Sequence, residues 1–191
     1  MSNFSNRLIL YNKNLVSKTI ETECIKLLQD IHFIGDKLTY NNDQFYLVGD
    51  KFLNLITFCG CSTSIQTDPD ENNSNFVAIK LSTFTDKQYF YLGKVPFNYS
   101  CSNCKSSINL TDNNIKRFSI KQDDYFTCPE CNHHNYYHQI NWRRKAGIGQ
   151  FFIEIHGVFD GEGLPNDELL RDLNNLTESN WEHFYAYSSS K

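Results

Sequence analysis

Hydrophobic positions recur with a helical period near the start of the chain and with a strand period towards its end. Between residues 18 and 34 the apolar side chains share one face of a helix, and Gly35 follows as a stop signal. Residues 150–159 (QFFIEIHGVF) predict a strong strand, and residues 181–187 predict a closing aromatic strand. Residues 166–176 predict a short helix between them, with acidic side chains in its first turn.

Shorter apolar runs fill the first half of the chain. Residues 44–48 predict a strand, and residues 51–58 suit a short buried helix at least as well as a strand, so we favour the helix. Residues 66–75 contain no apolar side chain and predict an exposed loop. Residues 76–84 and 87–92 are strand-like and separated by a short polar turn, which predicts an antiparallel hairpin.

This order of elements predicts an α+β fold, mainly antiparallel sheet with flanking helices. A cysteine-bearing segment, residues 97–140, interrupts strand-rich sequence on both sides. We therefore expect residues 1–96 and 141–191 to form one discontinuous α+β domain, and residues 97–140 to form an inserted module.

Four of the seven cysteines form two C-x-x-C pairs, Cys101/Cys104 and Cys128/Cys131, separated by 23 residues. This spacing indicates metal ligation in a reducing compartment rather than disulfides. A tight turn at each pair brings both thiolates to one side, so two facing turns form a tetrahedral four-sulfur cage. The interval between the pairs holds strand-like pieces at residues 108–110 and 115–120, which predict a β-hairpin.

The two cysteine pairs resemble those of the zinc ribbon family, whose metal-binding turns, or knuckles, sit on β-hairpins. The resemblance covers residues 97–140, and the remaining order of motifs is similar to that of uncharacterised bacterial zinc-ribbon proteins. The family often has Gly directly after the second Cys of each knuckle, where the backbone needs a positive φ. Lys105 and Asn132 occupy those positions here, and Asn tolerates this geometry better than Lys.

The resemblance implies one structural Zn²⁺. A four-cysteine site leaves no open position for water or substrate, so its expected role is to stabilise a module too small to hold itself together. Rubredoxin-like iron is the alternative metal, and we prefer zinc because the flanking residues are polar. We expect His133, His134 and His138 to be solvated or to support the ligands from outside.

The other cysteines give weaker signals. Cys24 lies on the apolar face of the first predicted helix, which indicates a buried and inert thiol. Cys59 and Cys61 flank a glycine, and we expect packing in a turn rather than metal or redox chemistry.

Composition and charge change the picture mainly by region. The 191 residues are 40% hydrophobic and 15% aromatic, which is typical of a folded globular chain. No apolar run approaches the roughly 20 residues needed to cross a bilayer, and we expect a cytoplasmic protein with no membrane association. The formal net charge of -4 combines nine basic and ten acidic residues in 1–95, seven basic and four acidic in 96–150, and two basic and eight acidic in 151–191.

The basic segment also carries aromatic side chains, and the two together are the ingredients of a surface that contacts phosphates and stacks on bases. The alternative is a solvated linker that pairs with the acidic segment. The candidate binding surface consists of Lys116, Arg117, Tyr136, Tyr137, Trp142, Arg143, Arg144 and Lys145.

Glu154 and His156 share one face of the strand 150–159 and are the candidate acid/base pair of an enzyme. No nucleophile motif, phosphate loop or metalloprotease signature accompanies them. A solvent-facing strand surface with a satisfied histidine is the interpretation that we favour.

The leading hypothesis is therefore a non-enzymatic zinc-binding interaction protein, whose ribbon presents a surface for a protein or a nucleic acid. One alternative is a hydrolase-like enzyme that uses Glu154 and His156, with the ribbon as scaffold. A second alternative is an inhibitor or immunity-type protein, which binds a basic partner through acidic C-terminal residues such as Glu178 and Glu182.

Overall fold

A computed structural model describes residues 6–12, 18–40, 42–59, 65–67, 76–84, 88–93, 97–110, 117–121 and 123–187 of the chain. Every strand pair in these ranges is antiparallel, and helices accompany the sheets, so the chain belongs to the α+β class as the hydrophobic pattern predicts.

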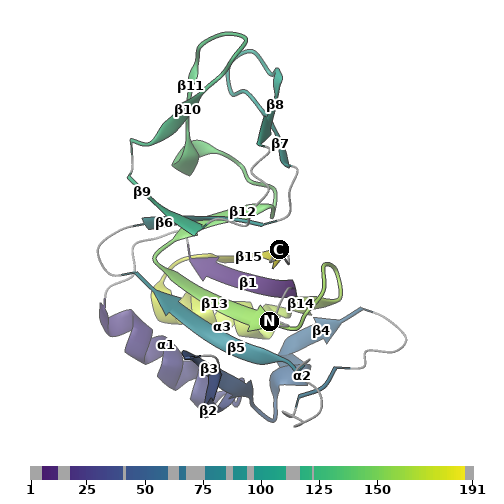
Figure 1. The fold of residues 1–191 in the computed structure, drawn as a ribbon. Coiled ribbons are helices and arrows are strands. Elements are labelled where there is room, and N and C mark those ends of the chain that lie inside the picture. The colour runs from purple at the N-terminus through teal and green to yellow at the C-terminus, as the bar shows by residue number, and fades with distance from the viewer. Residues whose placement is uncertain are drawn as a thin grey trace.

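The largest element is a six-stranded antiparallel sheet (Figure 1). Its strands are, in spatial order, β15 (Trp181–Tyr187), β1 (Asn6–Asn12), β13 (Phe151–His156), β5 (Ala78–Thr83), β3 (Asp43–Val48) and β2 (Ile34–Tyr40). The strand predicted at 150–159 lies between β1 and β5, away from either edge.

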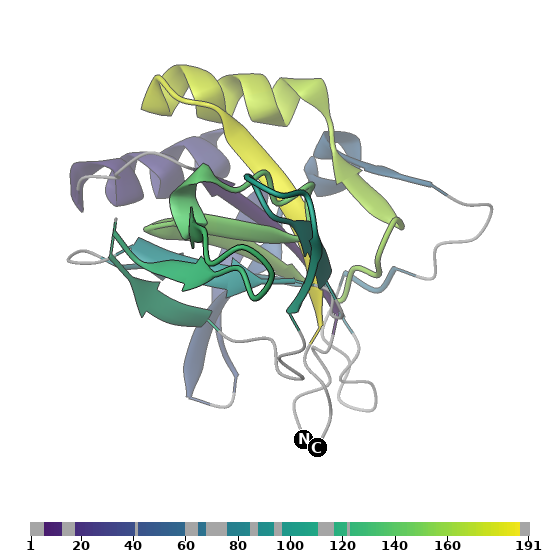
Figure 2. The ribbon, with the colours of Figure 1, turned by 90° about the horizontal axis from the view of Figure 1, so that it is seen from above.

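Two helices, α1 (Lys18–Asp30) and α3 (Asp167–Thr177), cover one face of this sheet and contact each other (Figure 2). Their apolar faces bury Cys24, Leu28, Leu169 and Leu173 against the sheet. Cys24 is fully buried, which confirms the predicted burial, and burial together with the charge of Glu23 raises the pKa of its thiol to about 12.

A three-stranded sheet covers the opposite face. It consists of β12 (Ala146–Gly149), β6 (Gln88–Leu92) and β9 (Arg117–Ile120) in the order β12-β6-β9. Aromatic side chains fill the space between the two sheets, namely Tyr11, Tyr91, Phe152 and Phe184. Gly147 permits the close approach, because a Cβ atom there would lie 2.6 Å from Cε1 of Phe184.

Two small hairpins project beyond the three-stranded sheet, at the end of the molecule opposite α1 and β2 (Figure 1). One pairs β7 (Phe97–Ser100) with β8 (Ser107–Leu110), and the other pairs β10 (Tyr125–Thr127) with β11 (His134–Tyr136). The short 3-10 helix η1 (Tyr137–Gln139) follows. We call these two hairpins the ribbon.

Residues 51–58, for which the sequence suggested either a short helix or a strand, contain one of each. A single helical turn, α2 (Phe52–Leu55), buries Phe52 and Leu55, and β4 (Ile56–Phe58) follows at once. β4 pairs with β14 (Gly163–Pro165), so the two form a separate small sheet. Most of the predicted loop at 66–75 lies outside the described residues.

The predicted hairpin between residues 76–84 and 87–92 is wrong. β5 pairs with β13 and β3 in the large sheet, whereas β6 pairs with β12 and β9 in the small one. Alternating apolar residues mark each segment as a strand, but they do not say with which strand it pairs.

The predicted hairpin of residues 108–110 with 115–120 is also wrong. β8 pairs with β7, and β9 pairs with β6, outside the segment 97–140. The division into a discontinuous domain and an inserted module stays a prediction. β9 lies in the predicted module but pairs with β6, which lies in the predicted domain.

The first helix ends earlier than Gly35. His32 has a φ of 54°, the Phe33 N–H donates to the Leu28 carbonyl at 2.8 Å, and the His32 N–H donates to the Gln29 carbonyl at 2.9 Å. These two bonds form a Schellman motif, with His32 in the position that glycine usually takes. Gly35 lies one residue inside β2 instead.

Candidate metal centre

The four paired cysteines lie on the tips of the two ribbon hairpins. Cys101 and Cys104 occupy the turn between β7 and β8, whose last paired residues are Ser100 and Ser107. Cys128 and Cys131 occupy the turn between β10 and β11. The expectation that each knuckle sits on a β-hairpin is therefore confirmed.

The two knuckles have the same backbone geometry. In the first, the Lys105 N–H donates to the Cys101 carbonyl at 3.1 Å, and in the second the Asn132 N–H donates to the Cys128 carbonyl at 2.9 Å. Lys105 has a φ of 63° and Asn132 a φ of 57°. The positive φ expected after the second cysteine is present in both knuckles, although neither residue is glycine.

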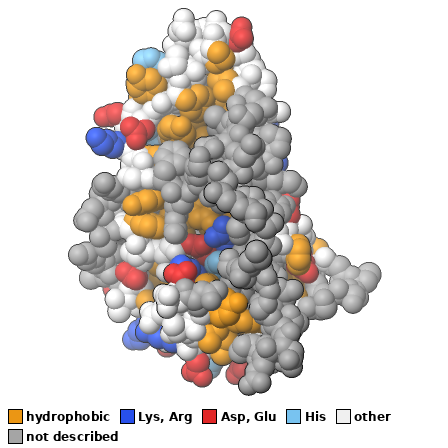
Figure 3. All heavy atoms as spheres, in the orientation of Figure 1, with side chains coloured by type: hydrophobic (Ala, Val, Ile, Leu, Met, Phe, Trp, Pro, Cys, Tyr) orange, Lys and Arg blue, Asp and Glu red, His pale blue; other side chains and the backbone are white. Residues whose placement is uncertain are grey.

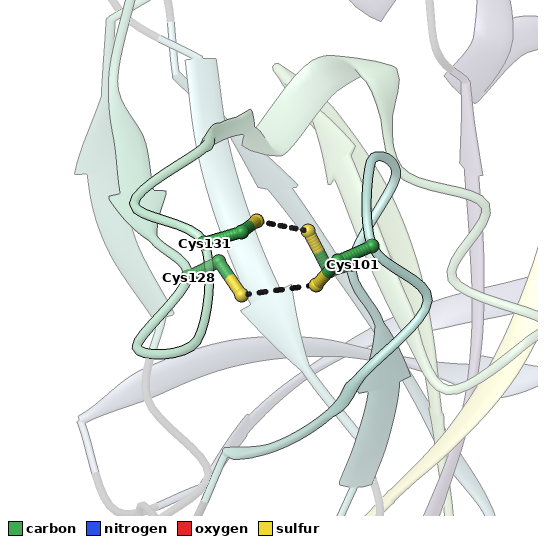
Figure 4. Close-up of side chains that lie close together, drawn as sticks. Cys101, Cys128 and Cys131 are labelled. Carbon is green, nitrogen blue, oxygen red and sulfur yellow. Dashed lines mark hydrogen bonds between the residues drawn. The ribbon is translucent and has the colours of Figure 1, made fainter.

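The four sulfur atoms face one another across the gap between the knuckles (Figure 4). All of them lie within 4.8 Å of one another, and two contacts that cross the gap, Cys101 to Cys131 and Cys104 to Cys128, are each 3.7 Å. A tetrahedron of sulfurs around a metal ion with Zn–S bonds of about 2.3 Å has edges of about 3.8 Å. The geometry of this donor set therefore fits a single tetrahedral ion.

Local hydrogen bonds favour the thiolate form on which metal binding depends. Burial raises the pKa of the Cys101 thiol, but the N–H groups of Cys104 and Asn103 lower it to a value below the usual one. The hydroxyl of Ser106 and the N–H groups that follow in the turn lower the pKa of Cys128 to about 6. These bonds thus stabilise negative charge on the sulfurs of Cys101 and Cys128, whereas, against the N–H of His133, burial and the bond to the Cys104 sulfur raise the pKa of Cys131 to about 11.

Asn135 connects the two knuckles and is the main residue that the sequence pattern missed. It is buried in β11, and its Oδ1 accepts bonds from the Ser102 N–H at 3.1 Å and from the Tyr99 hydroxyl at 3.2 Å. Its Nδ2 donates to the Cys101 sulfur at 3.8 Å. Asn135 therefore holds the second hairpin against the first and supports a ligand directly.

The three nearby histidines do not belong to the sulfur cage. His133, His134 and His138 are exposed, and the only group of potential metal ligands among the described residues is the four cysteines. The His134 ring stacks on Tyr125 with 3.9 Å between centroids. The histidine side chains thus lie on the ribbon surface, and it is the side chain of Asn135 that contacts a cysteine sulfur.

The base of the ribbon uses its aromatic side chains for packing. Trp142 is only 6% exposed, donates from Nε1 to the Tyr137 carbonyl at 3.1 Å, and packs with Tyr137 and Tyr99 against the three-stranded sheet. The expectation that Trp142 offers an exposed ring for stacking is wrong, because the ribbon needs this ring to attach to the sheet. Tyr137 is half-buried in the same cluster.

The remaining residues of the candidate binding surface differ in how far they are described and how exposed they are. Lys116 lies outside the described residues, and Arg117 belongs to β9, with only its backbone described. Tyr136 and Lys145 are half-buried. Figure 3 shows hydrophobic side chains over the ribbon end of one face of the molecule, among polar and a few charged ones.

Arg143 and Arg144 are exposed and adopt unusual backbone angles. Their φ values are 47° and 59°, two consecutive non-glycine residues in the left-handed region. Two clefts, of about 680 Å³ and about 400 Å³, adjoin this segment, and Arg143 lines both of them. Lys105 lines the smaller cleft. The structure therefore brings basic side chains from the first knuckle and the ribbon exit to one region.

Glu154 and His156 lie together in the interior rather than on a solvent-facing strand surface, which corrects the expectation from the alternation. Glu154 is 2% exposed and His156 6% exposed, because β13 is a central strand with both faces covered. Glu154 accepts bonds from the Ser82 hydroxyl at 2.6 Å and from Arg7 at 3.2 Å, and the Nε2 of His156 lies 3.7 Å from its Oε2.

This buried cluster joins three strands of the large sheet, β1, β5 and β13, through Arg7, Ser82 and Glu154. Burial lowers the pKa of His156 despite the neighbouring carboxylate of Glu154. Neither His156 nor Glu154 lines either of the two clefts described above. The arrangement is that of a buried ion pair between strands.

The acidic residues near the C-terminus have local structural partners. Glu178 ends α3 with a φ of 49°, and its N–H donates to the Asn174 carbonyl. Glu182 accepts a hydrogen bond from the Tyr11 hydroxyl at 2.8 Å. Burial and this bond to Glu182 raise the pKa of Tyr11 well above its usual value.

The comparisons with protein-family models, curated proteins and solved structures found no match to this chain. Among the described residues, no helix combines the length and the apolar character needed to span a membrane. What can be said about function therefore comes from the site itself.

Proposed function

We propose that this chain is a non-enzymatic interaction protein, in which one structural Zn²⁺ bound by Cys101, Cys104, Cys128 and Cys131 keeps the ribbon folded. The observation that carries the proposal is the four-sulfur arrangement at the tips of two short hairpins. Hairpins of three or four residues per strand cannot bury enough apolar surface to be stable alone. A metal with four protein ligands supplies that stability and leaves no position for a substrate.

The partner that we propose is an anionic macromolecule, a nucleic acid or an acidic protein surface, held at the base of the ribbon. Lys105, Arg143 and Arg144 line the clefts there, and the side chains of all three are exposed. Exposed guanidinium groups contact phosphates and carboxylates without needing a deep pocket. The burial of Trp142 limits base stacking, so we expect backbone contacts rather than recognition of base sequence.

Mobility-shift titrations of zinc-loaded protein with single- and double-stranded oligonucleotides test this proposal, together with pull-downs using acidic protein baits. We expect the double variant Arg143→Ala/Arg144→Ala to weaken binding of the preferred partner at least tenfold. Arg171→Ala is the matched control, because this exposed arginine of α3 lines neither cleft. Failure of every probe to bind, together with substrate turnover that Glu154→Gln abolishes, would contradict the proposal in favour of an enzyme.

A further inference from the structure

The larger cleft lies beside β15, the edge strand of the six-stranded sheet. Residues 138–144, which leave the ribbon, form one wall, and residues 181–183 of β15 with Leu170 of α3 form the other. Its volume of about 680 Å³ falls in the range of roughly 300–1,000 Å³ that small-molecule sites occupy. The cleft is therefore large enough for a small organic ligand.

His183 lies in the wall of this cleft and is only 8% exposed. Within the described part of the chain, its Nε2 is buried and has no hydrogen-bond partner. A buried polar atom without a hydrogen-bond partner destabilises the folded protein. A ligand hydroxyl that bonds to this nitrogen would remove that cost. Burial and the charge of Arg144 lower the pKa of His183 to about 4, which keeps the ring neutral at pH 7.

Two arginines supply positive charge at the same cleft. Arg143 and Arg144 both line it, and no ion pair joins either of them to an acidic side chain of the described residues. Both also keep left-handed backbone angles, which cost a non-glycine residue about 1–2 kcal/mol each. Backbone strain of this type is concentrated at binding sites, where it fixes side chains in place.

The other groups of the cleft fit a ligand with a polar and an apolar part. Ile140, Leu170, Trp142 and Trp181 provide apolar contact. Glu182 is the acidic group of the lining, and its carboxylate already accepts the Tyr11 hydroxyl. Two guanidinium groups facing one carboxylate leave an excess of one positive charge, which favours an anionic ligand.

We propose that this cleft binds a small phosphate ester that carries hydroxyl groups, such as a sugar phosphate. Arg143 and Arg144 donate to the phosphate oxygens, and His183 hydrogen-bonds to a hydroxyl of the ligand. A phosphate group carries close to two negative charges at neutral pH, and its oxygens can accept hydrogen bonds from both guanidinium groups. The pair of arginines therefore suits a phosphate ester better than a ligand with a single carboxylate. The site goes beyond the function proposed above, since its ligand is a small molecule and not a macromolecule.

Calorimetric titration of the zinc-loaded full chain tests the proposal with ribose 5-phosphate, ribose and inorganic phosphate as probes. We expect ribose 5-phosphate to bind most tightly and ribose not to bind measurably. Arg144→Gln, at an exposed position, should weaken ribose 5-phosphate binding at least tenfold, and His183→Gln should weaken it about fivefold or more. The matched control Arg171→Gln should change the Kd by less than twofold.

Ribose binding as tightly as its phosphate, or Arg144→Gln binding as tightly as the natural chain, would overturn the proposal. Inorganic phosphate binding as tightly as the ester would overturn the role of the hydroxyl groups. Zinc content and oligonucleotide binding are measured on the same samples. Loss of ester binding in His183→Gln with unchanged oligonucleotide binding would support the small-molecule site independently of the function proposed for the ribbon.

Discussion

Lys105 and Asn132 show how much of the ribbon depends on a single backbone angle in each knuckle. Both residues have positive φ values, and each donates its N–H to the carbonyl of the first cysteine of its pair. A left-handed angle costs an ordinary L-residue about 1–2 kcal/mol, while Asn tolerates it better and glycine pays no steric penalty. The first knuckle is therefore the more strained of the two.

Replacing Lys105 by glycine should consequently stabilise the protein. We expect Lys105→Gly to raise the free energy of unfolding by about 1 kcal/mol, because the relief of strain exceeds the loss of the exposed bond from its Nζ to the Ser102 carbonyl. Asn132→Gly should give a smaller gain. Urea denaturation of the zinc-loaded proteins measures both changes, and a loss of stability in Lys105→Gly would contradict the strain argument.

We expect the buried and hydrogen-bonded side chain of Asn135 to raise the zinc affinity of the four cysteines. Asn135→Ala removes the acceptor of Ser102 and Tyr99 and the donor to the Cys101 sulfur. We expect zinc affinity, measured by competition with a chromophoric chelator, to fall by about 10–100-fold. Asn103→Ala is the matched control, because the exposed side chain of Asn103 makes one bond, to the Cys131 sulfur, and its backbone bond to Cys101 is kept in the variant. Equal effects of the two variants would refute the special role of Asn135.

His183 makes stability depend on pH in a defined direction. Its pKa is about 4 in the folded protein, because of burial and the charge of Arg144, against about 6.5 in an unfolded chain. Between these values the unfolded chain binds more protons, so this contribution to stability is full above pH 6.5 and is lost as pH falls towards 4. Thermal denaturation should show a smaller acid-induced loss for His183→Gln than for the natural chain. Identical pH profiles would contradict this prediction.

At the scale of elements, sequence patterns predicted the types of most strands and helices but not their partners. Spacing identified the four cysteines that the fold brings together, since C-x-x-C geometry is local, and the helix at 166–176 appears as α3 (Asp167–Thr177). Pairing is not local, and β5, β6 and β9 all took partners other than the neighbours expected. Asn135 was missed because a three-residue strand is too short for alternation to reveal a buried position.

The burial of Glu154 and His156 was missed for a related reason. Alternation on β13 placed Phe152 on the same face as both residues, and that face packs against the three-stranded sheet. Polar residues on one face of a strand usually indicate solvent, and only the complete sheet order shows that β13 is central. Arg7, the ion-pair partner, lies 147 positions away in sequence, so no local pattern connects it to Glu154.

The contact between the two sheets gives a prediction at the same scale. Alanine at position 147 would place its Cβ 2.6 Å from Phe184 and 3.0 Å from the Tyr11 ring. We expect Gly147→Ala to lower the free energy of unfolding by about 1–3 kcal/mol, because a packed aromatic layer must shift. Ser119→Ala, an exposed position in β9, should change stability little. Urea denaturation compares the two, and an unaffected Gly147→Ala protein would show that the layers do not pack as described.

At the scale of the whole molecule, helices, a six-stranded sheet and a three-stranded sheet form successive layers, and the ribbon stands at the far end (Figure 1). The layers are held by large buried clusters, whereas the apolar cluster at the tips of the ribbon has, among the described residues, only Cys101, Ile108 and Cys128 as buried members. On the proposed function, a metal held by the four cysteines would be the main stabilising group of the ribbon. Chelation should therefore raise amide hydrogen exchange in β10 and β11 before it does so in β1 and β13.

The most direct test of this account is the metal content of freshly reduced protein, determined by elemental analysis. We predict one equivalent of zinc per chain, its loss in Cys128→Ser, and its retention in Cys59→Ser, which removes an exposed cysteine outside the cage. Reduced protein that is folded and contains no metal would contradict the central claim. A stoichiometric content of iron instead of zinc would contradict the assignment of the ion.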